Sequence, residues 1–86
     1  MPEVSHFFGI SIRMYFDDHN PPHFHAIYAG AETEVGIAPL TVLRGRFPRR
    51  ALGMVLEWAA SHQQELLENW ERLHHDEAAQ SIDPLD

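Results

Sequence analysis

The hydrophobic pattern of this chain changes its period once, close to Pro48. Before that point, Gly9–Phe16 alternates apolar and polar residues, which is typical of a half-buried strand. Its apolar set is Ile10, Ile12, Met14 and Phe16. After that point, apolar residues recur at helical spacing, and Pro48 suits a first helical position because its missing N–H costs nothing there. Strands followed by a helix predict an α+β domain.

The segments His23–Tyr28 and Glu32–Ile37 fit a hairpin that turns at residues 29–31. One face would pack in the core, and it holds Phe24, Ala26, Tyr28, Thr33, Val35 and Ile37. The other face would hold His23, His25, Glu32 and Glu34, with His25 opposite Glu34 if the loop is Ala29–Gly30. Leu40–Arg44 is expected to add a short fourth strand that ends near Gly45.

The expected architecture is a small three- to four-stranded antiparallel sheet with one long C-terminal helix packed on it. Ser61 and Gln64 could form a capping box that kinks this helix. Residues 1–75 would form a single domain, and the polar segment 76–86 a flexible acidic tail. Trp70 lies in the middle of the apolar stripe, whereas Trp58 lies off its flank, either at the core edge or on a partner surface.

The composition is typical of a single cytoplasmic domain. The 86 residues suit one domain, and the absence of cysteine favours a cytoplasmic location. No signal peptide is recognisable, and no apolar stretch approaches the roughly 20 residues of a membrane helix. The net charge is −7, carried by residues 57–86 with eight acids and one arginine, while residues 1–56 are balanced.

The segment Asp17–His25 is the most unusual part of the chain, with three histidines and two carboxylates in nine residues. His23 and His25 would leave the same face of a strand, which suits zinc or another divalent metal. Asp18, His19 or Glu34 could complete the ligand set. Two other interpretations stay open: histidines that serve as ordinary hydrogen-bonding residues, and a metal-free catalytic site in which His19 or His23 acts as acid and base.

Four arginines lie within seven positions around the predicted start of the helix: Arg44, Arg46, Arg49 and Arg50. Positive charge in the first helical turn opposes the helix dipole, which favours acids there by about 0.3–1 kcal/mol each. The cluster, with Trp58, is therefore a candidate surface for an anion or a partner. An acidic protein, a nucleic-acid backbone and a second copy in a homodimer are the alternatives, beside a solvated loop with no function.

Several stretches resemble the bacterial domain-of-unknown-function family number 4160. They are Ile12–Phe16, Asp18–His25, Phe47–Leu52, Glu57–Trp58 and Glu65–Trp70, and the resemblance covers about residues 4–73. The histidine motif and the pair Arg49–Arg50 match without departure. The resemblance implies no assigned activity, but family genes often lie beside another small uncharacterised domain, in a layout similar to a toxin–antitoxin pair.

Two functions follow as hypotheses. The first is a cytoplasmic binding or regulatory component of such a gene pair, which contacts a cognate small protein or nucleic acid through its arginines and histidine-rich loop. The second is a small metal-dependent hydrolase or nuclease that uses His23 and His25. Whether the protein is an enzyme is left open by the sequence.

Overall fold

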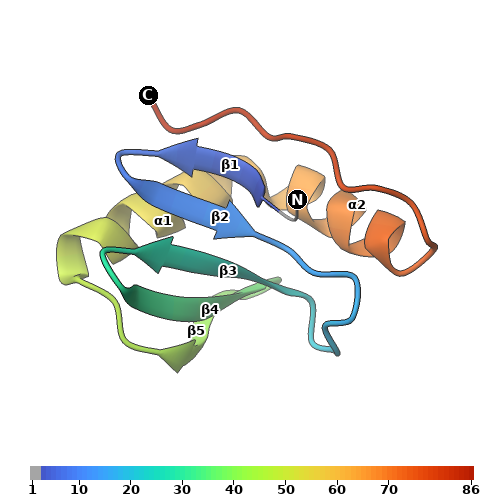
Figure 1. Ribbon diagram of the computed structural model, residues 1–86, viewed down its shortest axis with the longest axis horizontal. Helices are drawn as coiled ribbons and strands as arrows, with labels where there is room; N and C mark the ends of the chain where they lie inside the picture. Colours follow the sequence, from blue (N-terminus) through green and yellow to red (C-terminus); the bar gives the residue numbers. More distant parts are fainter. Residues whose placement is uncertain (1–2) are drawn as a thin grey trace.

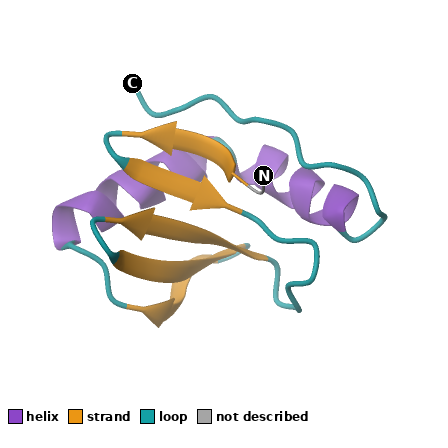
Figure 2. Cartoon of the chain, viewed as in Figure 1, coloured by secondary structure: helices purple, strands orange, loops and turns teal. Residues whose placement is uncertain are grey.

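The computed structural model describes residues 3–86 and shows a five-stranded sheet with two helices on one side of it (Figures 1 and 2). The strands are β1 (Glu3–Phe7), β2 (Ile10–Arg13), β3 (His23–Tyr28), β4 (Ala31–Ile37) and β5 (Leu40–Gly45). The helices are α1 (Arg49–Ser61) and α2 (Gln63–Leu73). Each strand is antiparallel to its neighbour in sequence, so the order in the sheet is the order along the chain.

The predicted α+β class and antiparallel sheet are confirmed, but the expected number of strands is wrong. The additional strand is β1, which joins β2 through Phe8 and Gly9 with φ values of 51° and 80°. Positive φ at both central residues is typical of a tight hairpin. Because Phe8 is not a usual turn residue, the turn was not expected. Met14 is buried as predicted, but Phe16 is 72% exposed, since β2 ends at Arg13.

The central hairpin is confirmed in position and register. Strands β3 and β4 turn at Ala29–Gly30, and His25 lies opposite Glu34. Phe24, Ala26, Thr33, Val35 and Ile37 are all buried, as predicted for the core face. The alternation of small and apolar residues with histidine and glutamate was therefore sufficient to place this part of the sheet.

The prediction of one long helix is wrong, because the chain breaks at His62 and forms two helices. The break falls where the sequence suggested a kink, but the expected capping box does not form. The Ser61 hydroxyl donates back to the Glu57 carbonyl oxygen at 3.5 Å, and no side-chain cap bond closes the start of α2.

Trp58 is a core residue and not a partner-binding one. It is fully buried and packs against Phe7 and Phe24, with ring centroids 5.4 and 5.9 Å away. The buried face of α1 is formed by Ala51, Val55, Trp58 and Ala59. The break at His62 gives each helix its own buried face. The prediction of one continuous apolar stripe along a single helix therefore placed Trp58 wrongly.

The segment after His75 lies against the domain, in contrast to the flexible tail that its polar composition predicted (Figure 1). Ile82 is buried, and its N–H donates to the Val4 carbonyl oxygen at 2.8 Å. The Trp58 indole N–H donates to the Asp83 carbonyl oxygen at 2.7 Å. Within residues 3–86, neither helix is long and apolar enough to cross a membrane.

Candidate metal centre

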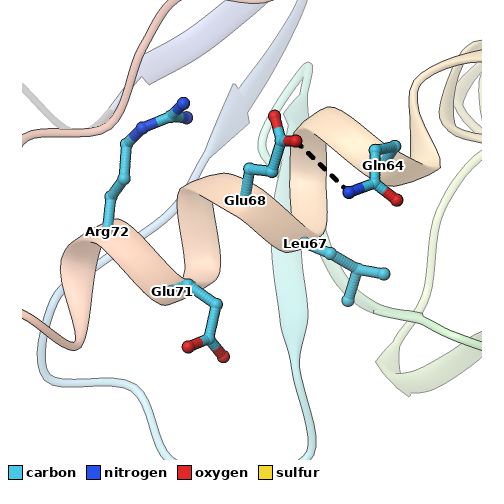
Figure 3. A pocket seen from close by; sticks show the side chains of 5 residues that line it. All are labelled: Gln64, Leu67, Glu68, Glu71 and Arg72. Carbon is cyan, nitrogen blue, oxygen red and sulfur yellow. Dashed lines mark hydrogen bonds between the residues drawn. The ribbon is translucent and has the colours of Figure 1, made fainter.

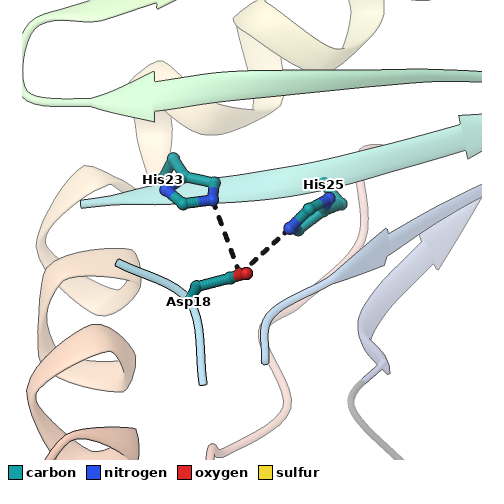
Figure 4. A group of neighbouring side chains, drawn as sticks. All are labelled: Asp18, His23 and His25. Carbon is teal, nitrogen blue, oxygen red and sulfur yellow. Dashed lines mark hydrogen bonds and ion pairs between the residues drawn. The ribbon is translucent and has the colours of Figure 1, made fainter. Parts of the chain in front are cut away.

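Three side chains that the sequence placed near one another converge at one end of β3: Asp18, His23 and His25 (Figure 4). Asp18 comes from the loop between β2 and β3, while both histidines belong to β3. His23 and His25 are two positions apart on a strand, so their rings leave the same side. One ligand atom from each of the three residues lies within 4.8 Å of the others.

The donor atoms of this group lie close enough together to surround one ion, and one pair is also at hydrogen-bond distance. The Asp18 Oδ2 atom is 3.0 Å from His25 Nε2 and 3.5 Å from His23 Nε2. Around a tetrahedral ion with bonds of about 2.0–2.2 Å, two donor atoms stand about 3.3–3.6 Å apart. Both histidines are only 7% exposed, so their rings are held in place by packing.

Each histidine is also oriented through its second ring nitrogen. His23 Nδ1 is 2.8 Å from the Pro21 carbonyl oxygen, which can only accept, so this nitrogen carries a proton. In the neutral ring the lone pair then belongs to Nε2, which points to Asp18. His25 Nδ1 is 3.1 Å from Glu32 Oε2, a carboxylate acceptor. Histidines that bind metals are commonly oriented in this way.

The Asp18 loop is fixed from the far end of the chain by His74, just beyond α2. Its Nε2 is 2.9 Å from the Asp18 carbonyl oxygen, and its Nδ1 is 2.8 Å from the Trp70 carbonyl oxygen. These two hydrogen bonds, first the one to Trp70 and then the one to Asp18, raise the pKa of His74 above its ordinary value. Both acceptors are satisfied at once only by the protonated ring.

An open cleft of about 400 Å³ lies beside the group. Its lining residues are Asp18, His19, Asn20, Pro21, His23, Glu34, Leu43 and Arg44. Glu34 Oε1 is 3.7 Å from His23 Nε2, and the Cα atoms of Glu34 and Arg44 pair across β4 and β5. The cleft is therefore lined by Asp18 and His23 together with Arg44.

The structure brings all four residues predicted for a metal to the same place, since Glu34 Oε1 is 3.7 Å from His23 Nε2. Asp18, His23 and His25 form the tight group, while Glu34 lies at its open side. Two contributors were not predicted. Glu32 lies diagonally across the hairpin from His25, which the register could have indicated, whereas His74 is 56 positions from Asp18 and gave no sequence signal.

The arginine cluster is divided by the fold. Arg44 lines the cleft, whereas Arg46, Arg49 and Arg50 do not, and all four are exposed. No hydrogen bond or ion pair to their side chains is found within residues 3–86. His19 also lines the cleft and is exposed.

A second hollow lies on the outer face of α2 (Figure 3). Its side chains all come from that helix, and the Gln64 amide donates to Glu68 at 3.2 Å. It contains no histidine and no convergent group of metal-binding atoms, and we therefore place the candidate site at β3.

The fold and the site define a class of small α+β domains with a histidine–carboxylate group suited to a divalent metal. The sequence profile of the family described as "Domain of unknown function (DUF4160)" matches residues 9–71. The chain belongs to this family. The match includes the three residues of the group but not His74 or the tail. No match is found among curated proteins or among solved structures.

Proposed function

We propose that Asp18, His23 and His25 bind a divalent transition metal and that the protein is a small metal-dependent hydrolase. The observation that supports this proposal is the convergence of two imidazole Nε2 atoms on one carboxylate oxygen. In neutral rings with Nδ1 protonated, both lone pairs would face negative charge. A shared cation removes this conflict.

Two nitrogen donors and one oxygen donor suit zinc or iron(II). Three protein ligands leave at least one coordination position for water, and the adjoining cleft gives a substrate access to that position. A bound zinc ion lowers the pKa of its water to about 7, which supplies hydroxide near neutral pH. The donor set and the open cleft together support hydrolysis rather than a purely structural ion.

Protons on the two histidines are the competing way to supply positive charge. His23 Nε2 is 3.5 Å from Asp18 Oδ2 and 3.7 Å from Glu34 Oε1. Direct N–H···O hydrogen bonds are shorter, about 2.7–3.2 Å. The wider spacing at His23 supports an ion between these atoms, whereas His25 Nε2 is at hydrogen-bond distance from Asp18 Oδ2, 3.0 Å, and could also be held there by a proton. Under the alternative, His19 or His23 would serve a metal-free reaction as acid and base.

The test is zinc titration of purified, chelator-treated protein by calorimetry, with metal analysis of the untreated protein. Wild type is expected to bind one zinc ion per chain, and His23→Ala/His25→Ala to lose that binding. The matched control is His6→Ala/His75→Ala, which removes two exposed histidines outside the group. Circular dichroism confirms that each variant is folded. Equal titrations for wild type and His23→Ala/His25→Ala would refute the metal centre.

A second function is favoured by the remaining arginines. We propose that Arg46, Arg49 and Arg50 contact a cognate protein or nucleic acid in a toxin–antitoxin-like gene pair in the cytoplasm. Arg49 and Arg50 begin α1, whose first turn contains no acid, and their side chains have no ionic partner within residues 3–86. A second copy of the chain, through its acidic α2, is a further candidate partner.

Co-expression with the product of the neighbouring gene tests this second function. A complex that co-elutes from a sizing column is expected, and Arg49→Glu/Arg50→Glu should dissociate it. The charge change Arg72→Glu on α2 is the control. Separate elution of the two wild-type proteins would count against this partner.

A further inference from the structure

We infer that the cleft beside the metal group is a phosphate subsite, in which Arg44 binds a phosphodiester and Glu34 accepts a proton from the attacking water. The inference rests on the proposed metal-dependent hydrolase, and it names the substrate class and two further residues of that site. It starts from the residues that share the cleft with Asp18 and His23.

Arg44 has a fixed backbone and an uncommitted side chain. The buried Thr33 donates its hydroxyl hydrogen bond to the Arg44 carbonyl oxygen at 2.8 Å. Gly45 then ends β5 directly against the backbone of Glu32. The guanidinium is exposed at the cleft, and no hydrogen bond or ion pair to it is found within residues 3–86. A planar guanidinium in this state is suited to two hydrogen bonds with a phosphate.

Glu34 differs from the three metal-binding residues in position. Its Oε1 is 3.7 Å from His23 Nε2, and its side chain is 25% exposed, so it lies at the open side of the group. A carboxylate there would be within reach of a water molecule that enters from the cleft. This placement is that of a general base, for which hydrogen-bond reach to the water is the first requirement.

The net charge of the site indicates whether a phosphodiester or a phosphate monoester would bind there. A divalent ion and Arg44 balance the three carboxylates of Asp18, Glu32 and Glu34. The loaded site is therefore neutral, and it accepts a phosphodiester monoanion at lower electrostatic cost than a monoester dianion. Without the ion the same site is negative, so we expect phosphate binding only in the metal-loaded protein.

The reaction balances with water as the only co-substrate. The oxygen of the attacking water forms a new P–O bond while Glu34 takes one of its protons. The P–O bond to the leaving alcohol breaks, and the electron pair stays on the alcohol oxygen, which takes a proton from solvent. Glu34 then returns its proton to solvent, and the products are a phosphate monoester and an alcohol.

The experiment measures hydrolysis of bis(p-nitrophenyl) phosphate and of p-nitrophenyl phosphate by zinc-loaded protein. We expect wild type to prefer the diester. Arg44→Gln should raise KM for the diester about tenfold or more, as for a lost charged hydrogen bond. Glu34→Gln should lower kcat by about 10²-fold or more, as for a lost general base, with one zinc ion still bound. Arg72→Gln on α2, whose contact is Asn69, should match wild type.

The outcomes separate this inference from the proposed function. If wild type binds no zinc, the proposed function fails and the inference fails with it. If wild type binds zinc and hydrolyses neither ester, or if Arg44→Gln behaves as Arg72→Gln does, the phosphate subsite is refuted while the metal centre stands. If Glu34→Gln loses its zinc, Glu34 is a metal ligand and the assignment as a base is wrong.

Discussion

Gly45 ends β5 with a φ of +91°, a backbone conformation that strongly favours glycine. A Cβ atom at this position would lie 2.3 Å from the Glu32 carbonyl oxygen and 3.0 Å from the Thr33 Cα atom. Both neighbours are backbone atoms, so neither can move aside as a flexible side chain would. The close approach of β4 thus requires glycine at position 45, directly after Arg44. The same strand carries Glu32, which orients His25.

We therefore expect Gly45→Ala to lower the free energy of unfolding by about 1–3 kcal/mol, measured by urea denaturation. Because the change displaces Glu32 and Arg44, zinc affinity should fall as well. Gly53→Ala is the control, since a Cβ there meets no atom within 4 Å on an exposed part of α1. It should raise stability by up to about 1 kcal/mol. Equal stability of Gly45→Ala and wild type would contradict the steric argument.

The loop between β2 and β3 is held in position by a residue just beyond α2. His74, beyond the end of α2, accounts for this link through its contact with the Asp18 carbonyl oxygen. Its raised pKa means that the folded protein binds the His74 proton more tightly than the unfolded chain does. This contribution to stability is complete below the ordinary imidazole pKa, and it is lost as pH rises through the pKa of the folded state.

The variant His74→Gln should accordingly be less stable than wild type at about pH 5, and the difference should diminish by about pH 8. Urea denaturation of both proteins across this range measures the effect. Because all other histidines are common to both, the difference isolates His74. A difference that does not change with pH would show that His74 acts only as a packed ring.

The elements also show what the sequence can predict. Alternation placed β2 to β4, and Ala29–Gly30 fixed the register that puts His23, His25 and the glutamates on one side. These signals lie within a few residues of the structure that they specify. The burial of Trp58 and the contact between His74 and Asp18 depend on packing between distant segments. A residue pattern along one helix does not contain that information.

In the molecule as a whole, the tail completes the core. Ile82 is 4% exposed and shares the core with Val4 and Trp58. The buried Asn69 reinforces this contact, because its amide donates to the Gln80 carbonyl oxygen and accepts from the Gln80 N–H, both at 2.8 Å. The family match ends at residue 71, so this closure of the core belongs to the part of the chain beyond the match.

Ile82→Ala should therefore lower the free energy of unfolding by about 2–4 kcal/mol, as for other large-to-small changes in a core. Chemical denaturation of the whole chain measures the loss. Ser81→Ala changes the exposed neighbouring residue and should have an effect within about 0.5 kcal/mol. A similarly small effect of Ile82→Ala would mean that the tail is held by its hydrogen bonds alone.

The hydrogen bond between Ile82 and Val4 joins the two ends of the described chain, whereas every strand pairs only with its neighbour in sequence. Local pairings form early during folding, and a loop that encloses almost the whole chain closes late. We therefore expect the sheet and helices to form first and the tail to dock on a surface that already exists. In hydrogen exchange, the Ile82 amide then reports on undocking of the tail, while the amides of β3 report on global unfolding.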